Sequence, residues 1–165
     1  QKMKIKSRRT FFKTTFLTSL IMITNKNSLF ASITPLQTLA VVQEDLFPKE
    51  MITQANAYAY VNLIFKHSRV SAQDKQFLRN GTKWLNEEAV VKYNKVYTNL
   101  SSKERQNILE IISNTSWGET WIKTVLSYIL EAVLGDPLYG INKGKFGWKW
   151  LNHTTGLPRP KEMYI

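Results

Sequence analysis

The chain has 165 residues, of which 43% are hydrophobic and 12% aromatic, and this is enough apolar material for one compact domain. It contains no cysteine, so disulfides, iron–sulfur clusters, cysteine-ligated zinc and haem attached through CxxCH are excluded. The formal net charge is +11, but seven of the 23 basic residues lie among the first 31, which hold no acidic residue. The other 16 basic residues stand against 12 acidic ones, so most of the excess charge belongs to the N-terminus.

The N-terminal segment carries a motif that resembles the twin-arginine export signal. The motif reads Ser-Arg-Arg-Thr-Phe-Phe-Lys and is formed by Ser7, Arg8, Arg9, Phe11, Phe12 and Lys13, with Phe12 in place of the more usual leucine. The apolar run that follows, from Thr15 to Ile23, is shorter than the roughly 20 residues of a membrane-spanning helix. We therefore predict that residues 1–31 are an export signal read by a receptor and take no part in the fold.

The twin-arginine route moves folded proteins, and it is used by proteins that must acquire a cofactor or a partner in the cytoplasm. Lys26 follows the apolar run, where a positive charge disfavours the general secretory route. We expect the chain to reach the periplasm folded. Because its sequence shows no cofactor motif, a partner is the expected reason for this route.

Residues 32–165 are predicted to form a single helical domain. Thr34-Pro35 supplies an N-cap hydroxyl and a proline at the first turn, and the apolar pattern that follows continues to Leu46, before Pro48. A second helical stretch is expected at about residues 50–66, and a third is expected to start at Ser71 and to run to about Tyr97.

Two more helix starts follow the capping-box pattern, at Ser101–Glu104 and at Ser116–Glu119, and the second of these helices is expected to stop at Gly135. No convincing alternation of period two is present. We therefore predict an all-α fold, a small bundle of four to six helices.

The character of the chain changes after Gly135. Five of the seven glycines and three of the five prolines lie in residues 135–165, interleaved with aromatic residues. Such a sequence predicts an extended, irregular tail from about residue 136, which cannot build a core of its own. We expect this tail to lie on the bundle or on another protein.

Few residues suggest chemistry. The two histidines are interpreted as a helix-end residue (His67) and a hydrogen-bonded or interfacial residue of the tail (His153). No GxGxxG motif is present, so a bound dinucleotide is not expected. Trp84, Trp117 and Trp121 have helical spacing and are predicted core residues, whereas Trp148 and Trp150 are predicted to contact a partner.

The segment from Asp136 to Leu151 resembles the C-terminal signature of the gluconate 2-dehydrogenase subunit 3 family. That signature reads roughly Asp-Pro-x-Tyr-Gly-Gly-Asn, then a few residues, then Gly-Trp, then an end rich in glycine and proline. The residues that match are Asp136, Pro137, Tyr139, Gly140, Asn142, Gly147 and Trp148, with Gly156, Pro158, Arg159 and Pro160 in the final part. Ile141 replaces the usual second glycine.

The resemblance implies a small, non-catalytic subunit of a periplasmic, membrane-associated dehydrogenase. In this family a large subunit carries FAD and oxidises a sugar or sugar acid, and electrons pass to a cytochrome c subunit or to the quinone pool. The large subunit is then exported through the twin-arginine translocase on the signal of the small one, which helps it to mature. This chain is accordingly expected to hold no cofactor, metal or catalytic residue.

The expected partner interface is the tail. Its predicted residues are Asp136, Pro137, Tyr139, Gly140, Asn142, Gly147, Trp148, Trp150 and Arg159. Two hypotheses from other classes stay open. The chain would otherwise be a free-standing exported enzyme or ligand-binding protein with a pocket under the aromatic tail, or a cytoplasmic nucleic-acid binder. Nucleic-acid affinity should vanish when residues 1–31 are deleted, because the strong charge lies there.

Overall fold

The computed structural model describes residues 34–158 and 161–162, and residues 34–165 cluster as a compact unit of their own. Within the described residues all regular elements are helical, so the predicted all-α class is confirmed. The predicted export motif and Arg159 lie outside the described residues. In chain order the elements are α2 (Pro35–Leu46), α3 (Lys49–Ala55), α4 (Ala57–Lys66), α5 (Ala72–Tyr93), η1 (Tyr97–Asn99), α6 (Ser102–Ser113), α7 (Ser116–Leu134), η2 (Pro137–Tyr139), η3 (Lys143–Lys145) and α8 (Phe146–Trp150).

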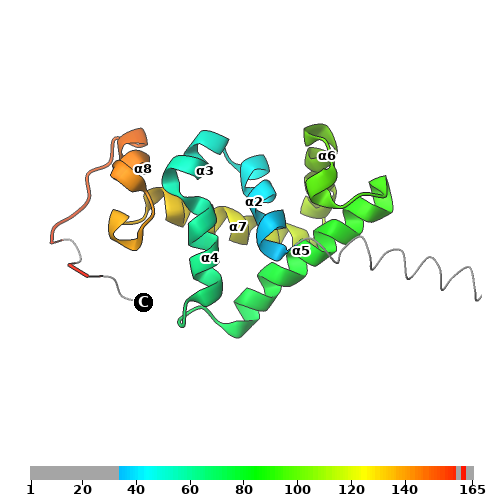
Figure 1. The fold of residues 1–165 in the computed structure, drawn as a ribbon, viewed down its shortest axis with the longest axis horizontal. Helices are drawn as coiled ribbons and strands as arrows, with labels where there is room; N and C mark the ends of the chain where they lie inside the picture. The colour runs from blue at the N-terminus through cyan, green and yellow to red at the C-terminus, as the bar shows by residue number, and fades with distance from the viewer. Residues whose placement is uncertain (1–33, 159–160, 163–165) are drawn as a thin grey trace, which may run out of the picture. The chain divides into compact units, whose positions relative to one another are not determined.

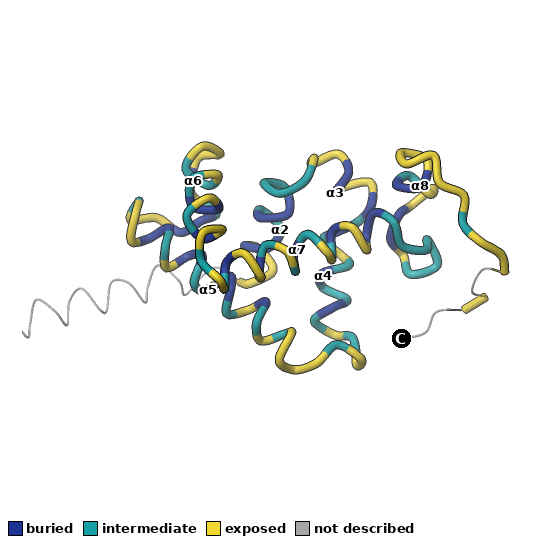
Figure 2. The backbone as a smooth tube through the Cα atoms, turned by 180° about the vertical axis from the view of Figure 1, so that it is seen from behind, coloured by how far each residue is buried: buried dark blue, intermediate teal, exposed yellow. Residues whose placement is uncertain are grey.

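Helix α7 is the centre of the bundle, because it contacts α2, α3, α4, α5, α6 and α8. Figures 1 and 2 show it from opposite sides, crossing the other helices, with α6 near one of its ends and α8 near the other. The face that α7 buries carries Trp121, Val125, Ile129 and Val133 at intervals of four residues. Of the helices that the structure describes, none is long and apolar enough to cross a bilayer.

Two predicted helix starts are confirmed in atomic detail. The Thr34 hydroxyl accepts the Gln37 N–H at 3.3 Å while the Gln37 side chain accepts the Thr34 N–H at 2.8 Å. Ser101 and Glu104 exchange the same pair of bonds at the start of α6. In each case two backbone donors that have no partner within the helix are satisfied by side chains.

Other boundaries differ from the prediction. The stretch at 50–66 is interrupted at Asn56 (φ 59°), and α5 ends at Tyr93 because Asn94 is left-handed (φ 53°). Asparagine enters this conformation more easily than most residues. The box predicted at Ser116 is wrong, because Thr115 caps α7 and accepts the Gly118 N–H at 3.1 Å. With α8 added, the described residues form seven α-helices where four to six were expected.

A close contact in the core joins α7 to α5. Trp121 is fully buried, and its indole lies against the backbone of Gly81, donating a hydrogen bond to the Leu78 carbonyl at 3.3 Å. The core position predicted for Trp121 is thus confirmed. Trp84 and Trp117 are half-buried and pack edge to face, with ring centroids 5.1 Å apart.

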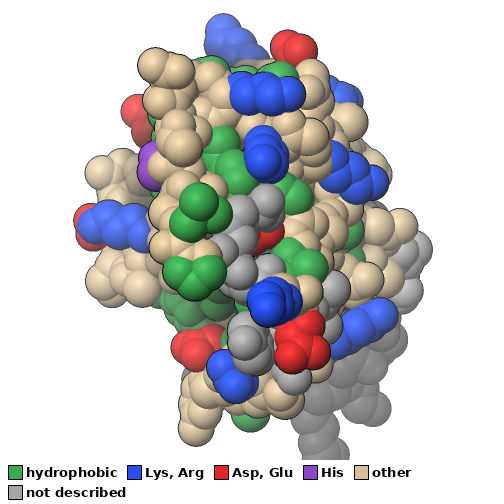
Figure 3. All heavy atoms as spheres, turned by 90° about the vertical axis from the view of Figure 1, so that its left-hand side faces the viewer, with side chains coloured by type: hydrophobic (Ala, Val, Ile, Leu, Met, Phe, Trp, Pro, Cys, Tyr) green, Lys and Arg blue, Asp and Glu red, His purple; other side chains and the backbone are tan. Residues whose placement is uncertain are grey.

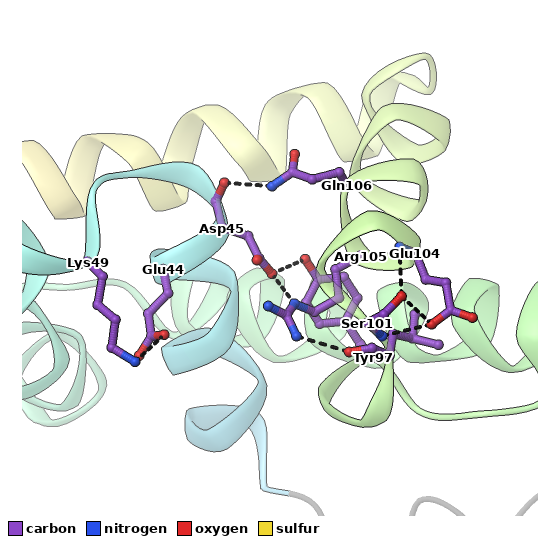
Figure 4. A network of polar contacts seen from close by, with 9 residues as sticks. Glu44, Asp45, Lys49, Tyr97, Ser101, Glu104, Arg105 and Gln106 are labelled. Carbon is purple, nitrogen blue, oxygen red and sulfur yellow. Dashed lines mark hydrogen bonds and ion pairs between the residues drawn. The ribbon is translucent and has the colours of Figure 1, made fainter.

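A buried polar cluster ties α2 to α6 (Figure 4). The Asp45 carboxylate, whose side chain is 4% exposed, accepts hydrogen bonds from the Tyr97 hydroxyl and from Arg105 Nε, each at 2.7 Å. The Asp45 carbonyl accepts a third from the Gln106 amide at 3.0 Å. Burial and the Asp45 carboxylate raise the pKa of Tyr97, and hydrogen bonding to Asp45 raises the pKa of Arg105.

Replacing Gly81 with alanine should destabilise the domain, although alanine is the better helix former by about 1 kcal/mol. A Cβ there would lie 2.0 Å from Trp121 Nε1. We expect urea denaturation to show a loss of about 1–3 kcal/mol in the free energy of unfolding. Val91→Ala, on the same helix at a 73% exposed position, is the control and should change it by less than about 0.5 kcal/mol. An unchanged or increased value for Gly81→Ala would contradict the close contact.

Tyr97→Phe should weaken the domain at neutral pH and flatten its alkaline decline. The folded pKa of Tyr97 is raised above the ordinary 10.0, so its contribution is complete below pH 10 and is lost as the pH rises further, when only the unfolded chain releases the proton. Between pH 9 and pH 11 the wild type should lose about 1 kcal/mol more stability than Tyr97→Phe. Equal losses in urea titrations at the two pH values would show that the hydroxyl does not hold its proton in the fold.

Candidate partner-binding surface

The end of α7 leads into a tight turn built by the first half of the tail. Gly135 ends the helix, and the Asp136 carboxylate accepts the Leu138 N–H at 2.9 Å, which caps η2. Pro137 occupies the first position of η2, where its fixed φ fits and no N–H is needed. Gly140 closes the turn in the left-handed region (φ 74°), which glycine adopts without steric cost. The Asp-Pro-x-Tyr-Gly part of the signature is therefore a capped turn.

Asn142 fastens this turn to two helix ends. It is fully buried and left-handed (φ 45°). Its backbone N–H donates to the Ala55 carbonyl at the end of α3 (3.0 Å), and its side-chain amide donates to the Gly135 carbonyl at the end of α7 (2.9 Å). The side-chain oxygen accepts the Gly147 N–H at the start of α8 (2.8 Å). One residue thus satisfies backbone groups of three helices, which helix geometry leaves without partners.

Gly147 and Trp148 hold α8 against the end of α7. A Cβ on Gly147 would lie 1.8 Å from the Val133 carbonyl oxygen, so only glycine permits this approach. Trp148 is 6% exposed, and its indole N–H donates to the Leu134 carbonyl. Lys145 Nζ lies 5.9 Å from the centre of the Trp148 ring. Gly147 and Trp148 therefore lie inside the subunit, whereas Lys145 is exposed.

The structure divides the predicted interface residues into two groups. Asn142, Gly147 and Trp148 are buried, and Asp136, Pro137 and Tyr139 are half-buried against the bundle. Gly140 and Trp150 are exposed. The tail up to α8 therefore lies on the bundle, which is one of the two placements expected for it, although η2, η3 and α8 make it less extended than predicted. Most of the signature residues pack against the helices and hold α8 in place, and we call this packed segment, residues 136–148, the mount. Only part of the signature is a surface that another protein can contact.

The exposed edge of the mount is apolar and basic. We call Trp150 and Leu151 the apolar edge; their exposed fractions are 54% and 50%. Phe47, in the turn after α2, packs edge to face against Trp150 with ring centroids 6.2 Å apart. Lys143, Lys145 and Lys149 are exposed in the same segment, and Figure 3 shows hydrophobic and Lys or Arg side chains together on this end of the molecule.

A pocket of about 480 Å³ opens on the other side of η2. Residues of α4, α7 and the turn line it, among them Tyr60, His67, Glu131, Asp136 and Tyr139. The Tyr60 hydroxyl donates to Glu131 at 2.7 Å, and burial together with this bond raises the pKa of Tyr60. No feature of the sequence singles out Tyr60 or Glu131, because no local pattern links residues 71 positions apart.

The comparison with protein families now decides the relationship. The model of gluconate 2-dehydrogenase subunit 3 matches residues 34–156. The chain belongs to this family. The matched range begins at the N-cap of α2 and includes the turn, the mount and α8. Searches of curated proteins and of solved structures find no match. In this gluconate 2-dehydrogenase subunit 3, most signature residues serve to pack the tail against the helices.

Asn142→Gly should loosen the mount. Glycine tolerates the left-handed backbone, so the variant removes only the two side-chain hydrogen bonds and leaves the Gly135 carbonyl and the Gly147 N–H without partners. We expect a loss of about 2–4 kcal/mol in the free energy of unfolding. Hydrogen exchange at the Gly147 amide should also become faster.

Asn94→Gly is the matched control. Asn94 is also left-handed, but it is exposed and caps α5, away from the tail. Its replacement should leave the Gly147 amide unchanged. Exchange at Gly147 that is equally slow in both variants would contradict the role given to Asn142.

Proposed function

We propose that the chain is the non-catalytic small subunit of an exported, FAD-dependent sugar or sugar-acid dehydrogenase of the gluconate 2-dehydrogenase type. The match to gluconate 2-dehydrogenase subunit 3 over residues 34–156 carries the proposal, since that description makes the chain one part of a larger dehydrogenase. The large partner subunit binds the FAD and performs the oxidation. A cytochrome c subunit, where present, takes the electrons.

In this proposal the chain is also the export escort. The Arg8-Arg9 motif would address the complex to the twin-arginine translocase, and the flavoprotein would travel with it to the periplasm. This translocase accepts folded proteins. A subunit whose tail is already packed on its bundle can bind its partner before transport, so the two chains can be exported together. The complex is proposed to associate with the inner membrane at its periplasmic face.

The polar groups of the bundle support a structural role. The most strongly perturbed tyrosine, Tyr97, donates to Asp45 inside the helix packing, and burial with the Glu44 hydrogen bond raises the pKa of Tyr58 to about 12. Each of these hydroxyls joins two helical segments and retains its proton. Neither arrangement is poised to exchange protons with a substrate near neutral pH.

The pocket beside η2 favours one alternative, a free-standing exported ligand-binding protein or enzyme. Its volume of about 480 Å³ is suitable for a small ligand, and Tyr60, Glu131 and Tyr139 bring polar groups to its walls. Under this alternative the isolated chain binds or converts a ligand without a partner. The main proposal gives the pocket no catalytic role.

Mild purification of the C-terminally tagged chain from periplasm and membranes should yield a yellow complex. We expect flavin absorbance near 450 nm and a larger flavoprotein chain in roughly equal amount. Dehydrogenase activity with an artificial electron acceptor should follow that larger chain through separation of the subunits, and the separated small subunit should be inactive. A colourless, monomeric protein would contradict the proposal, and turnover by that monomer would establish the alternative.

A further inference from the structure

We propose that Trp150 and Leu151 anchor the flavoprotein subunit by entering an apolar depression with an acidic rim on its surface. This inference rests on the function proposed above and adds the anchor residues and the chemistry of the partner surface. It assigns the contact to the outer edge of α8 rather than to the signature residues as a whole.

The exposure of large apolar side chains is concentrated at this place. Among the described residues, six large hydrophobic side chains are exposed: Leu36, Val91, Leu130, Trp150, Leu151 and Leu157. Leu36, Val91 and Leu130 lie on three separate helices and Leu157 lies in the segment after α8, whereas Trp150 and Leu151 are adjacent at the end of α8. Isolated exposed apolar residues are ordinary, but an adjacent pair that includes tryptophan is typical of a binding site.

The anchor is held in position before any partner arrives. The Phe47 ring supports one edge of Trp150, and the Leu151 N–H donates to the Gly147 carbonyl at 3.1 Å. The His153 N–H donates to the Trp148 carbonyl at 2.7 Å, which fixes the chain after α8. Because Asn142 and Trp148 fasten this unit to α7, binding would immobilise little that is not already fixed. A lower entropic cost of this kind raises affinity.

Charge indicates the nature of the partner surface. No Asp or Glu occurs from residue 137 to residue 161, and Lys143, Lys145 and Lys149 are exposed around α8. Exposed lysines in the segment that carries Trp150 and Leu151 fit an acidic rim beside an apolar depression. The contact should therefore form faster at low salt.

A protein fits this edge better than a membrane does. Helix α8 has five residues, whereas helices that lie in a bilayer surface present a long apolar face. A protein hot spot needs only a few well-packed side chains, with tryptophan preferred. Membership of a subunit family also requires a protein contact somewhere on this chain.

The test measures the affinity between the full chain and the flavoprotein subunit that co-purifies with it, by surface plasmon resonance at 50 and 300 mM NaCl. Trp150→Ala should weaken binding about 30-fold and Leu151→Ala about fivefold. Lys143→Gln, Lys145→Gln and Lys149→Gln together should lower the association rate at 50 mM and reduce the effect of salt. Thermal unfolding should confirm that Trp150→Ala keeps its fold, because the side chain is 54% exposed.

Val91→Ala is the matched control, since Val91 is exposed and lies on α5, away from the edge. Its affinity should stay within about twofold of the wild type. Wild-type affinity in Trp150→Ala would overturn the anchor and leave the proposed function standing. Absence of any complex with the wild type would overturn both. If Trp150→Ala no longer binds phosphatidylglycerol vesicles but keeps its affinity for the flavoprotein, Trp150 contacts lipid and the proposed protein anchor is overturned.

Discussion

The architecture of the tail depends on one buried asparagine. The last carbonyls of a helix and the first N–H groups of the next have no partners within their helices, and burying them unpaired is costly. Asn142 meets this constraint for α3, α7 and α8 with three hydrogen bonds of 2.8–3.0 Å. The Asn56 side chain holds the preceding turn in place by donating a hydrogen bond to the Gly140 carbonyl at 3.1 Å. Without these bonds the glycine-rich segment would have no fixed course.

This constraint separates two roles that the sequence pattern presents together. Asn142, Gly147 and Trp148 face inward and set the position of α8, whereas Trp150 and Leu151 face outward. The family signature is therefore largely a folding pattern that positions the surface proposed to contact the partner. Helix α7 connects this surface to the rest of the bundle, since it packs on α5 through Trp121 and on α8 through Val133 and Leu134. The end of α7 and the tail are therefore held together as one unit.

The sequence predicts most local helix starts, with an error of one residue at Ser116, but it does not predict long-range geometry. Thr34 and Ser101 were predicted as caps because their partners lie three residues away. The sequence does not predict the break at Asn56. The contact that accompanies its left-handed backbone is made with Gly140, 84 positions further on, and no local pattern shows such a contact. Burial of Trp148 was likewise missed, because periodicity cannot show that Gly147 lets α8 approach the end of α7. The sequence does not predict the pocket either, because Tyr60 and Glu131, which form a hydrogen bond at its wall, are 71 positions apart.

The central claim is that this chain carries a flavoprotein out of the cytoplasm, and the location of that flavoprotein tests it most directly. Cells that produce the complex with wild-type Arg8 and Arg9, or with both replaced by lysine, would be fractionated. The flavoprotein subunit in each fraction would then be measured by immunoblot and by flavin content. The account predicts a periplasmic flavoprotein with the wild-type signal and a cytoplasmic one with the double-lysine signal. A flavoprotein that reaches the periplasm equally in both strains would contradict it.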